Sequence, residues 1–111
     1  MKNYTELTSE IRNHLGKLHK EIPELMQGFM TMHKSANQEG TLTEKTKELI
    51  ATAIAVAIRC DDCIGMHMQR LIQLKATRTE ILEMLSVAIY MGGGPSLMYA
   101  AHALKAFEEL K

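Results

Sequence analysis

The run LIATAIAVAI, from Leu49 to Ile58, is the feature that most constrains the fold of this chain. Its apolar side chains fall on every side of a helix, which is the pattern of a helix in the centre of a protein. The run is far shorter than the roughly 20 residues that a membrane span needs. Elsewhere apolar residues recur at three- and four-residue steps, and no strand-like alternation is sustained. We therefore expect an all-α protein built around this helix.

Start and stop signals divide the chain into about six helices. Pro23 and Pro95 suit the first turns of the second and last helices, and Gly92-Gly93-Gly94 separates the last two. Capping boxes at 41–44 and 77–80 predict two further helix starts. The expected helices cover about residues 5–20, 23–37, 41–59, 60–75, 77–91 and 95–111. With no repeat or linker, residues 1–111 are expected to form a single domain, a compact bundle.

Composition limits the classes of function. Thirteen basic residues balance thirteen acidic ones and aromatic residues make up 5%, which argues against a nucleic-acid partner. The N-terminus has no apolar core of a signal peptide and no segment is long enough for a membrane, so we expect a cytoplasmic protein. The apolar faces are more than so short a chain can cover, which predicts a homo-oligomer with closed symmetry.

The chemically distinctive stretch runs from Cys60 to His67, CDDCIGMH. In a helix that starts near Cys60, the side chains of Cys60, Cys63 and His67 fall within roughly 60° of one another. Free backbone N–H groups at a helix start stabilise a thiolate, which is the nucleophile in disulfide exchange and peroxide reduction. The acidic Asp61 and Asp62 act in the opposite direction, because nearby negative charge raises the pKa of a thiol.

This spacing leaves three interpretations open. The two thiols could form a redox-active pair with His67 as proton relay, or Cys60, Cys63 and His67 could hold zinc. The third interpretation is structural, with two buried thiols and a satisfied histidine. Haem attachment is excluded, because Ile64 and not histidine follows Cys63. A closed zinc site would need a fourth ligand, for which the candidates are His14, His19, His33 and His102.

With Glu48 added, the pattern of Glu48, Cys60, Cys63 and His67 resembles the alkylhydroperoxidase-D-like branch of the carboxymuconolactone decarboxylase family. The resemblance is strongest over 48–67 and looser over 41–111, where it includes KATRTEILEML and MGGGPSLMYAAHALKAFEEL. It implies an all-helical, alkylhydroperoxidase-D-like fold that assembles into trimers or hexamers. By composition alone Glu48 would be a solvated acid in the first turn of a helix.

The resemblance also implies the roles of these residues in a thiol-dependent oxidoreductase. Cys63 attacks a small peroxide or disulfide, Cys60 resolves the intermediate as a disulfide, and Glu48 with His67 relays the proton. Reduction back to the dithiol would come from a lipoyl-bearing protein or a small thiol, and no cofactor is implied within the chain. The peroxidase members carry a histidine where this chain has Asp62, so one proton-transfer group is absent. The alternative is a non-enzymatic zinc-binding oligomer that uses Cys60, Cys63 and His67.

Three further residues could act at or near this site. Arg70 lies one helical turn past His67, where it could bias the charge of the site, although a plain surface arginine is the simpler interpretation. Tyr99 and His102 lie on the last helix and could line a pocket, with a core or interface role as the simpler interpretation.

Overall fold

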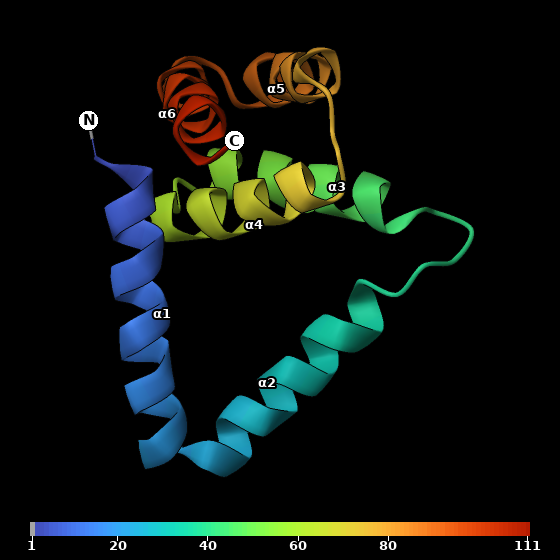
Figure 1. Cartoon of the computed structure of the whole chain (residues 1–111). Helices are drawn as coiled ribbons and strands as arrows, with labels where there is room; N and C mark the ends of the chain where they lie inside the picture. Colours follow the sequence, from blue (N-terminus) through green and yellow to red (C-terminus); the bar gives the residue numbers. More distant parts are fainter. Residues whose placement is uncertain (1) are drawn as a thin grey trace.

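The structure, a computed structural model, describes residues 2–111 and shows six helices and no strand in that range (Figure 1). The helices are α1 (Tyr4–Glu21), α2 (Pro23–Ala36), α3 (Glu44–Ala57), α4 (Asp61–Gln73), α5 (Arg78–Gly92) and α6 (Gly94–Leu110). The predicted all-α class and helix count are confirmed. No helix of the described residues is long and apolar enough to cross a bilayer.

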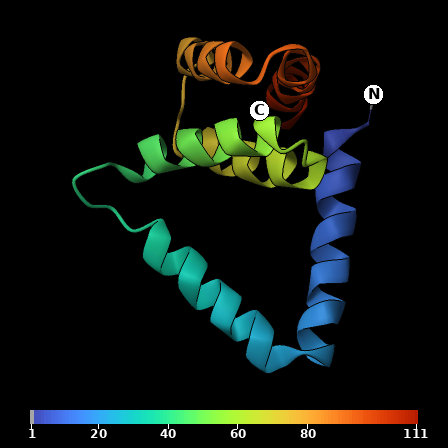
Figure 2. The same cartoon turned by 180° about the vertical axis from the view of Figure 1, so that it is seen from behind.

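The helices form two layers and a projecting arm. Helices α3 and α4 lie side by side, and α5 and α6 cover one face of this pair (Figures 1 and 2). Helix α1 packs across α4 and α6, whereas α2 packs only against α1 and has no buried residue. The loop between α2 and α3 swings outward before it returns to the start of α3 (Figure 2). Helices α1 and α2 therefore extend from the body as an arm.

The apolar helix α3 is only partly enclosed. Thr52, Ala55 and Val56 are buried against its neighbours, but Ile50, Ile54 and Ile58 are 47%, 54% and 65% exposed. The expectation that this helix lies at the centre is therefore wrong for one face within a single chain. Periodicity cannot distinguish a face that packs inside the chain from one that is left open.

Capping explains where two helices begin. The predicted capping box at Thr77 is confirmed, since Thr77 and Glu80 bond to each other's backbone N–H groups. The box predicted at Thr41 is wrong. Thr43 is the N-cap of α3 and accepts from the N–H of Thr46, while the carboxylate of Glu39 accepts from the N–H of Glu44. Both Thr41 and Thr43 are residues that can cap a helix. The loop before α3, in which the N–H of Gly40 donates to Leu42 O, leaves Thr43 as the cap.

Helices α3 and α4 are joined by a tight reversal. Arg59 has φ 61°, the left-handed conformation that ends many helices. Its N–H donates to Val56 O, and the N–H of Cys60 donates back to Ala55 O. Lys75 repeats this conformation at the end of α4 with φ 62°. The predicted turn after Arg59 is confirmed, and it folds α4 back along α3.

Helix α1 approaches α4 at Gly65. A methyl group at Gly65 would lie 2.8 Å from Thr8 Cγ2 and 3.3 Å from Tyr4 Cδ1. The absence of a side chain at Gly65 therefore lets Tyr4 reach the start of α4, where both cysteines lie.

Candidate active site

Cys60 and Cys63 lie at the junction of α3 and α4, joined by a disulfide with their Cα atoms 5.2 Å apart. The N–H of Cys60 is bonded to the end of α3, and its Sγ accepts from the N–H of Cys63 at 3.2 Å. Cys60 therefore ends one helix and caps the next. Both side chains are half-buried at the positive end of the α4 dipole, which stabilises a thiolate there when the pair is reduced.

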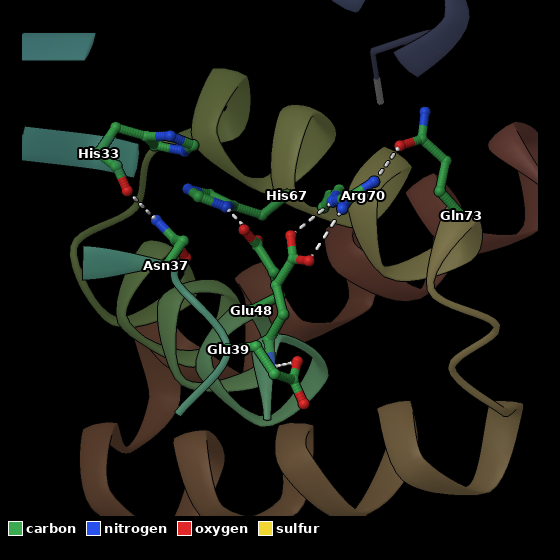
Figure 3. Close-up of polar contacts among 8 residues, drawn as sticks. His33, Asn37, Glu39, Glu48, His67, Arg70 and Gln73 are labelled. Carbon is green, nitrogen blue, oxygen red and sulfur yellow. Dashed lines mark hydrogen bonds and ion pairs between the residues drawn. The ribbon is translucent and has the colours of Figure 1, made fainter. Parts of the chain in front are cut away.

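The buried Glu48 and the half-buried His67 form a hydrogen-bonded pair between α3 and α4. Glu48 is only 2% exposed, and its Oε2 lies 2.6 Å from His67 Nδ1 (Figure 3). The pair can form because the reversal at Arg59 folds the two helices alongside each other. Since Nδ1 is engaged by Glu48, Nε2 is the His67 nitrogen left for proton exchange.

A second, more exposed pair lies one turn along the same helices. Arg70 donates from Nε and Nη2 to the two carboxylate oxygens of Glu44, at 2.8 and 2.9 Å. These hydrogen bonds hold the pKa of Glu44 below its ordinary value. They also raise the pKa of Arg70, to which the negative charge of Glu48 adds. Arg70 therefore joins α4 to α3, and its positive charge lies near Glu48. Figure 3 shows Arg70 beside His67.

Asp61 follows Cys60 directly, and its carboxylate points away from the solvent. Its Oδ1 accepts from Tyr4 OH at 2.6 Å and lies 3.0 Å from His102 Nδ1, while Lys2 Nζ lies 3.6 Å from Oδ2. Burial by itself would raise the pKa of Asp61, but hydrogen bonds from Tyr4 and His102 hold it below its ordinary value. The Tyr99 ring packs on His102 with ring centroids 4.6 Å apart.

The chain is similar to known proteins in both sequence and fold. The sequence model of the carboxymuconolactone decarboxylase family matches residues 23–106. The chain belongs to that family. A family protein from Legionella pneumophila is 55% identical, with a TM-score of 0.96 over 99% of this chain and 98% of that one.

Less similar relatives match this chain in structure or in sequence. A family protein from Thermotoga maritima, for which a role in an antioxidative response has been suggested, is 31% identical with a TM-score of 0.83. That match covers 93% of this chain and 88% of the Thermotoga chain. An uncharacterised protein of Cupriavidus necator is 43% identical over 106 residues, which cover 96% of this chain and 93% of that protein. The expected family membership is thus confirmed, and the similarity extends into α1.

The structure brings the four residues singled out by sequence into one region, with Glu48 against His67 and Cys60 bonded to Cys63. In the disulfide form, no three His, Cys, Asp or Glu side chains of residues 2–111 are arranged to hold a metal ion. Arg70 is an ion-pair partner of Glu44 and not a free surface arginine. Tyr99 packs on His102, and His102 bonds to Asp61 at the start of α4. Sequence reasoning missed the partners of Asp61, since nothing local links Tyr4 to a residue 57 positions away.

Proposed function

We propose that this protein is a thiol-dependent oxidoreductase that reduces small peroxides or disulfides with the Cys60–Cys63 dithiol. The observation that carries the proposal is the buried Glu48, bonded to His67 at 2.6 Å on the helix that holds both cysteines. A carboxylate that orients an imidazole beside a nucleophile is the recurring arrangement of activated thiols. The antioxidative role suggested for the Thermotoga relative agrees with this chemistry.

The proposed reaction takes two electrons from the dithiol. The Cys63 thiolate attacks the terminal oxygen of a hydroperoxide, the O–O bond breaks, and the alcohol leaves after it receives a proton. The sulfur of Cys63 is then a sulfenic acid. The Cys60 thiol attacks that sulfur, a water molecule leaves, and the disulfide forms. Through Nε2, His67 moves the proton between thiol and leaving group, while Glu48 holds the imidazole.

The cycle closes with an external dithiol, such as a lipoyl group on a partner protein, or with small thiols. The donor supplies two electrons and two protons to the disulfide and becomes oxidised itself. A disulfide substrate would be attacked by Cys63 at one of its sulfur atoms, with the same resolution by Cys60. We place this cycle in the cytosol, where thiol donors keep such pairs reduced.

We also propose that the working form is a homo-oligomer, because large apolar side chains are exposed on α2, α3, α5 and α6. The family resemblance implies a trimer or hexamer. Among the described residues, the projecting helix α2 packs only against α1, and α3 leaves one face open. Exposed side chains on these two helices and on α5 and α6 include Leu25, Phe29, Met30, Met32, Ile50, Ile54, Ile58, Tyr90, Met91, Leu97 and Met98. A solution mass equal to one chain, measured by light scattering, would reject this assembly.

Peroxide consumption by the pre-reduced protein tests the proposed chemistry. Cys63→Ser should abolish turnover, whereas Cys60→Ser should still consume one peroxide per chain and leave a sulfenic acid that dimedone labels. Glu48→Gln should slow the reaction by on the order of 100-fold, at the lower end of what a positioned acid–base group contributes. Glu44→Gln is the matched control, because it makes the same substitution one helical turn before Glu48 on α3. It should leave the rate nearly unchanged.

Two results would overturn the proposal. One is turnover in Cys63→Ser equal to that of the unmodified chain. The other is one zinc per chain, bound by the reduced protein and lost in Cys63→Ser, with no oxidation of the pair by any peroxide or disulfide. That second result would establish the metal-binding alternative.

A further inference from the structure

The carboxylate of Asp61 has an unusual position for a charge in a first helical turn. Exposed acids are common there because they complement the helix dipole. Asp62 is such a residue, being exposed to solvent. The side chain of Asp61 is only 10% exposed, and its donors come from α1 and α6. Two neighbouring aspartates therefore differ in how strongly water screens their charge.

The hydroxyl that holds Asp61 belongs to a fully enclosed side chain. Tyr4 is 0% exposed, and its backbone N–H is fixed in turn by the carboxylate of Glu109 at 2.9 Å. Lys105 bonds to that same carboxylate group at 2.9 Å. This set of contacts locks the start of α1 onto α6 and onto the first turn of α4. Capping does not explain these contacts of Asp61, because Cys60 is already the N-cap of α4.

We propose that Asp61 is a positioning residue that sets the thiolate content and reduction potential of the Cys60–Cys63 pair, with Tyr4 and His102 controlling how much of its charge the thiols experience. This inference rests on the redox function proposed above. A shielded negative charge next to Cys60 opposes thiolate formation, while the N-terminus of α4 favours it. Cys60 is thereby kept as a thiol until it donates its proton, and the thiolate that remains then attacks the sulfur of Cys63.

Removing the charge of Asp61 and removing its hydrogen-bond donor should change thiolate formation in opposite directions. Asp61→Asn removes the charge, so thiolate forms more readily and the reduced pair gains stability relative to the disulfide. Tyr4→Phe keeps the ring and its packing but withdraws the hydroxyl donor, so the charge of Asp61 is less neutralised and thiolate forms less readily. A purely structural role predicts a loss of folding stability in both variants and no shift of opposite sign.

Two measurements follow these shifts without any peroxide. The first is the rate of alkylation of each reduced cysteine against pH. The second is the equilibrium with glutathione, in which two glutathione molecules give two electrons to the protein disulfide and form one glutathione disulfide. Their protons pass to the protein dithiol or, where a cysteine is a thiolate, to the solvent. This equilibrium is measured above the midpoint of the alkylation profile, where thiolate contributes most. Tyr99→Phe is the matched control, because it removes a hydroxyl that makes no hydrogen bond among the described residues.

At a pH below the midpoint of the alkylation profile, we expect Asp61→Asn to raise the thiolate fraction by about threefold to tenfold. This corresponds to a fall of that midpoint by roughly half to one pH unit. The exchange constant should move toward the dithiol by about threefold, or about 15 mV. Tyr4→Phe should move both quantities the other way, and Tyr99→Phe should move neither. If Asp61→Asn does not fold, the comparison of Tyr4→Phe with Tyr99→Phe still decides.

Equal profiles and equal potentials in Tyr4→Phe and Tyr99→Phe would overturn the inference while leaving the proposed function intact. A shift of the same sign in Asp61→Asn and Tyr4→Phe would overturn it as well. A pair that does not cycle between dithiol and disulfide at all would overturn both the inference and the proposed function.

Discussion

The Glu48–His67 pair permits a sharp test of how a buried carboxyl group depends on one partner. Glu48 is 2% exposed, whereas the side chain of His67 is 24% exposed. His67→Leu should therefore leave the carboxyl group enclosed without its donor, at a cost of about 3 to 5 kcal/mol when it is ionised. Glu48→Leu should cost less, because the imidazole can turn to water. Leucine matches the approximate volume of both sites.

The informative comparison is with the variant that carries both changes. Replacing both partners with apolar side chains removes the unpaired group, so the double variant should be more stable than His67→Leu alone by about 2 to 3 kcal/mol. For a chain of this length that is roughly 8 to 12 °C in Tm. Urea unfolding at fixed protein concentration, on the disulfide form of each variant, measures the difference.

The Glu44–Arg70 pair on the same two helices is the control for this cycle. Its carboxylate and guanidinium are partly exposed to water, with side chains 26% and 43% exposed, so removing both partners should give only a small coupling. A double variant at Glu48 and His67 that is less stable than His67→Leu would refute the reasoning. It would mean that Glu48 finds another partner, or water, once the imidazole is gone.

Other predictions concern the backbone and the pH dependence of stability. Arg59→Gly should stabilise the protein by about 1 kcal/mol in urea unfolding, because φ 61° strains any residue with a Cβ atom, and an unchanged midpoint would contradict this. Gly65→Ala should destabilise it by about 1 to 3 kcal/mol by pressing on Thr8, and an unchanged Tm would show that α1 moves away freely. Burial, then the hydrogen bond to Asp61, raises the pKa of Tyr4 above its ordinary value of 10.0, so the stability it contributes is present below pH 10 and lost as pH rises further. Thermal unfolding of Tyr4→Phe should lack that alkaline loss. The lowered pKa of Asp61 acts in the opposite direction, so the stability that Asp61 gives the protein is present above pH 3.8 and lost as the pH falls. The stability of Asp61→Asn should therefore fall less steeply at acid pH.

Local signals carried much of the prediction of the fold. Apolar periodicity, Pro23, Pro95 and the box at Thr77 act over a few residues, and each marks the helix or helix start that the structure shows. The box at Thr41 failed for a local reason too, since an equally good cap stands two residues later and the loop geometry decides between them. The open face of α3 could not be predicted, because what covers a helix depends on distant elements.

The sequence by itself predicted the dithiol and its helix, because a four-residue spacing puts Cys63 and His67 on one helical face. Cys60 precedes this helix as its N-cap. The position of Glu48 was available only through family resemblance, and the reversal at Arg59 is what brings it to His67. The partners of Asp61 were decided by tertiary structure alone. Tyr4 and His102 lie 57 and 41 residues away, and they reach the first turn of α4 only because α1 and α6 cross that end of the helix. Chain-local chemistry set which groups can react, and packing set which charges surround them.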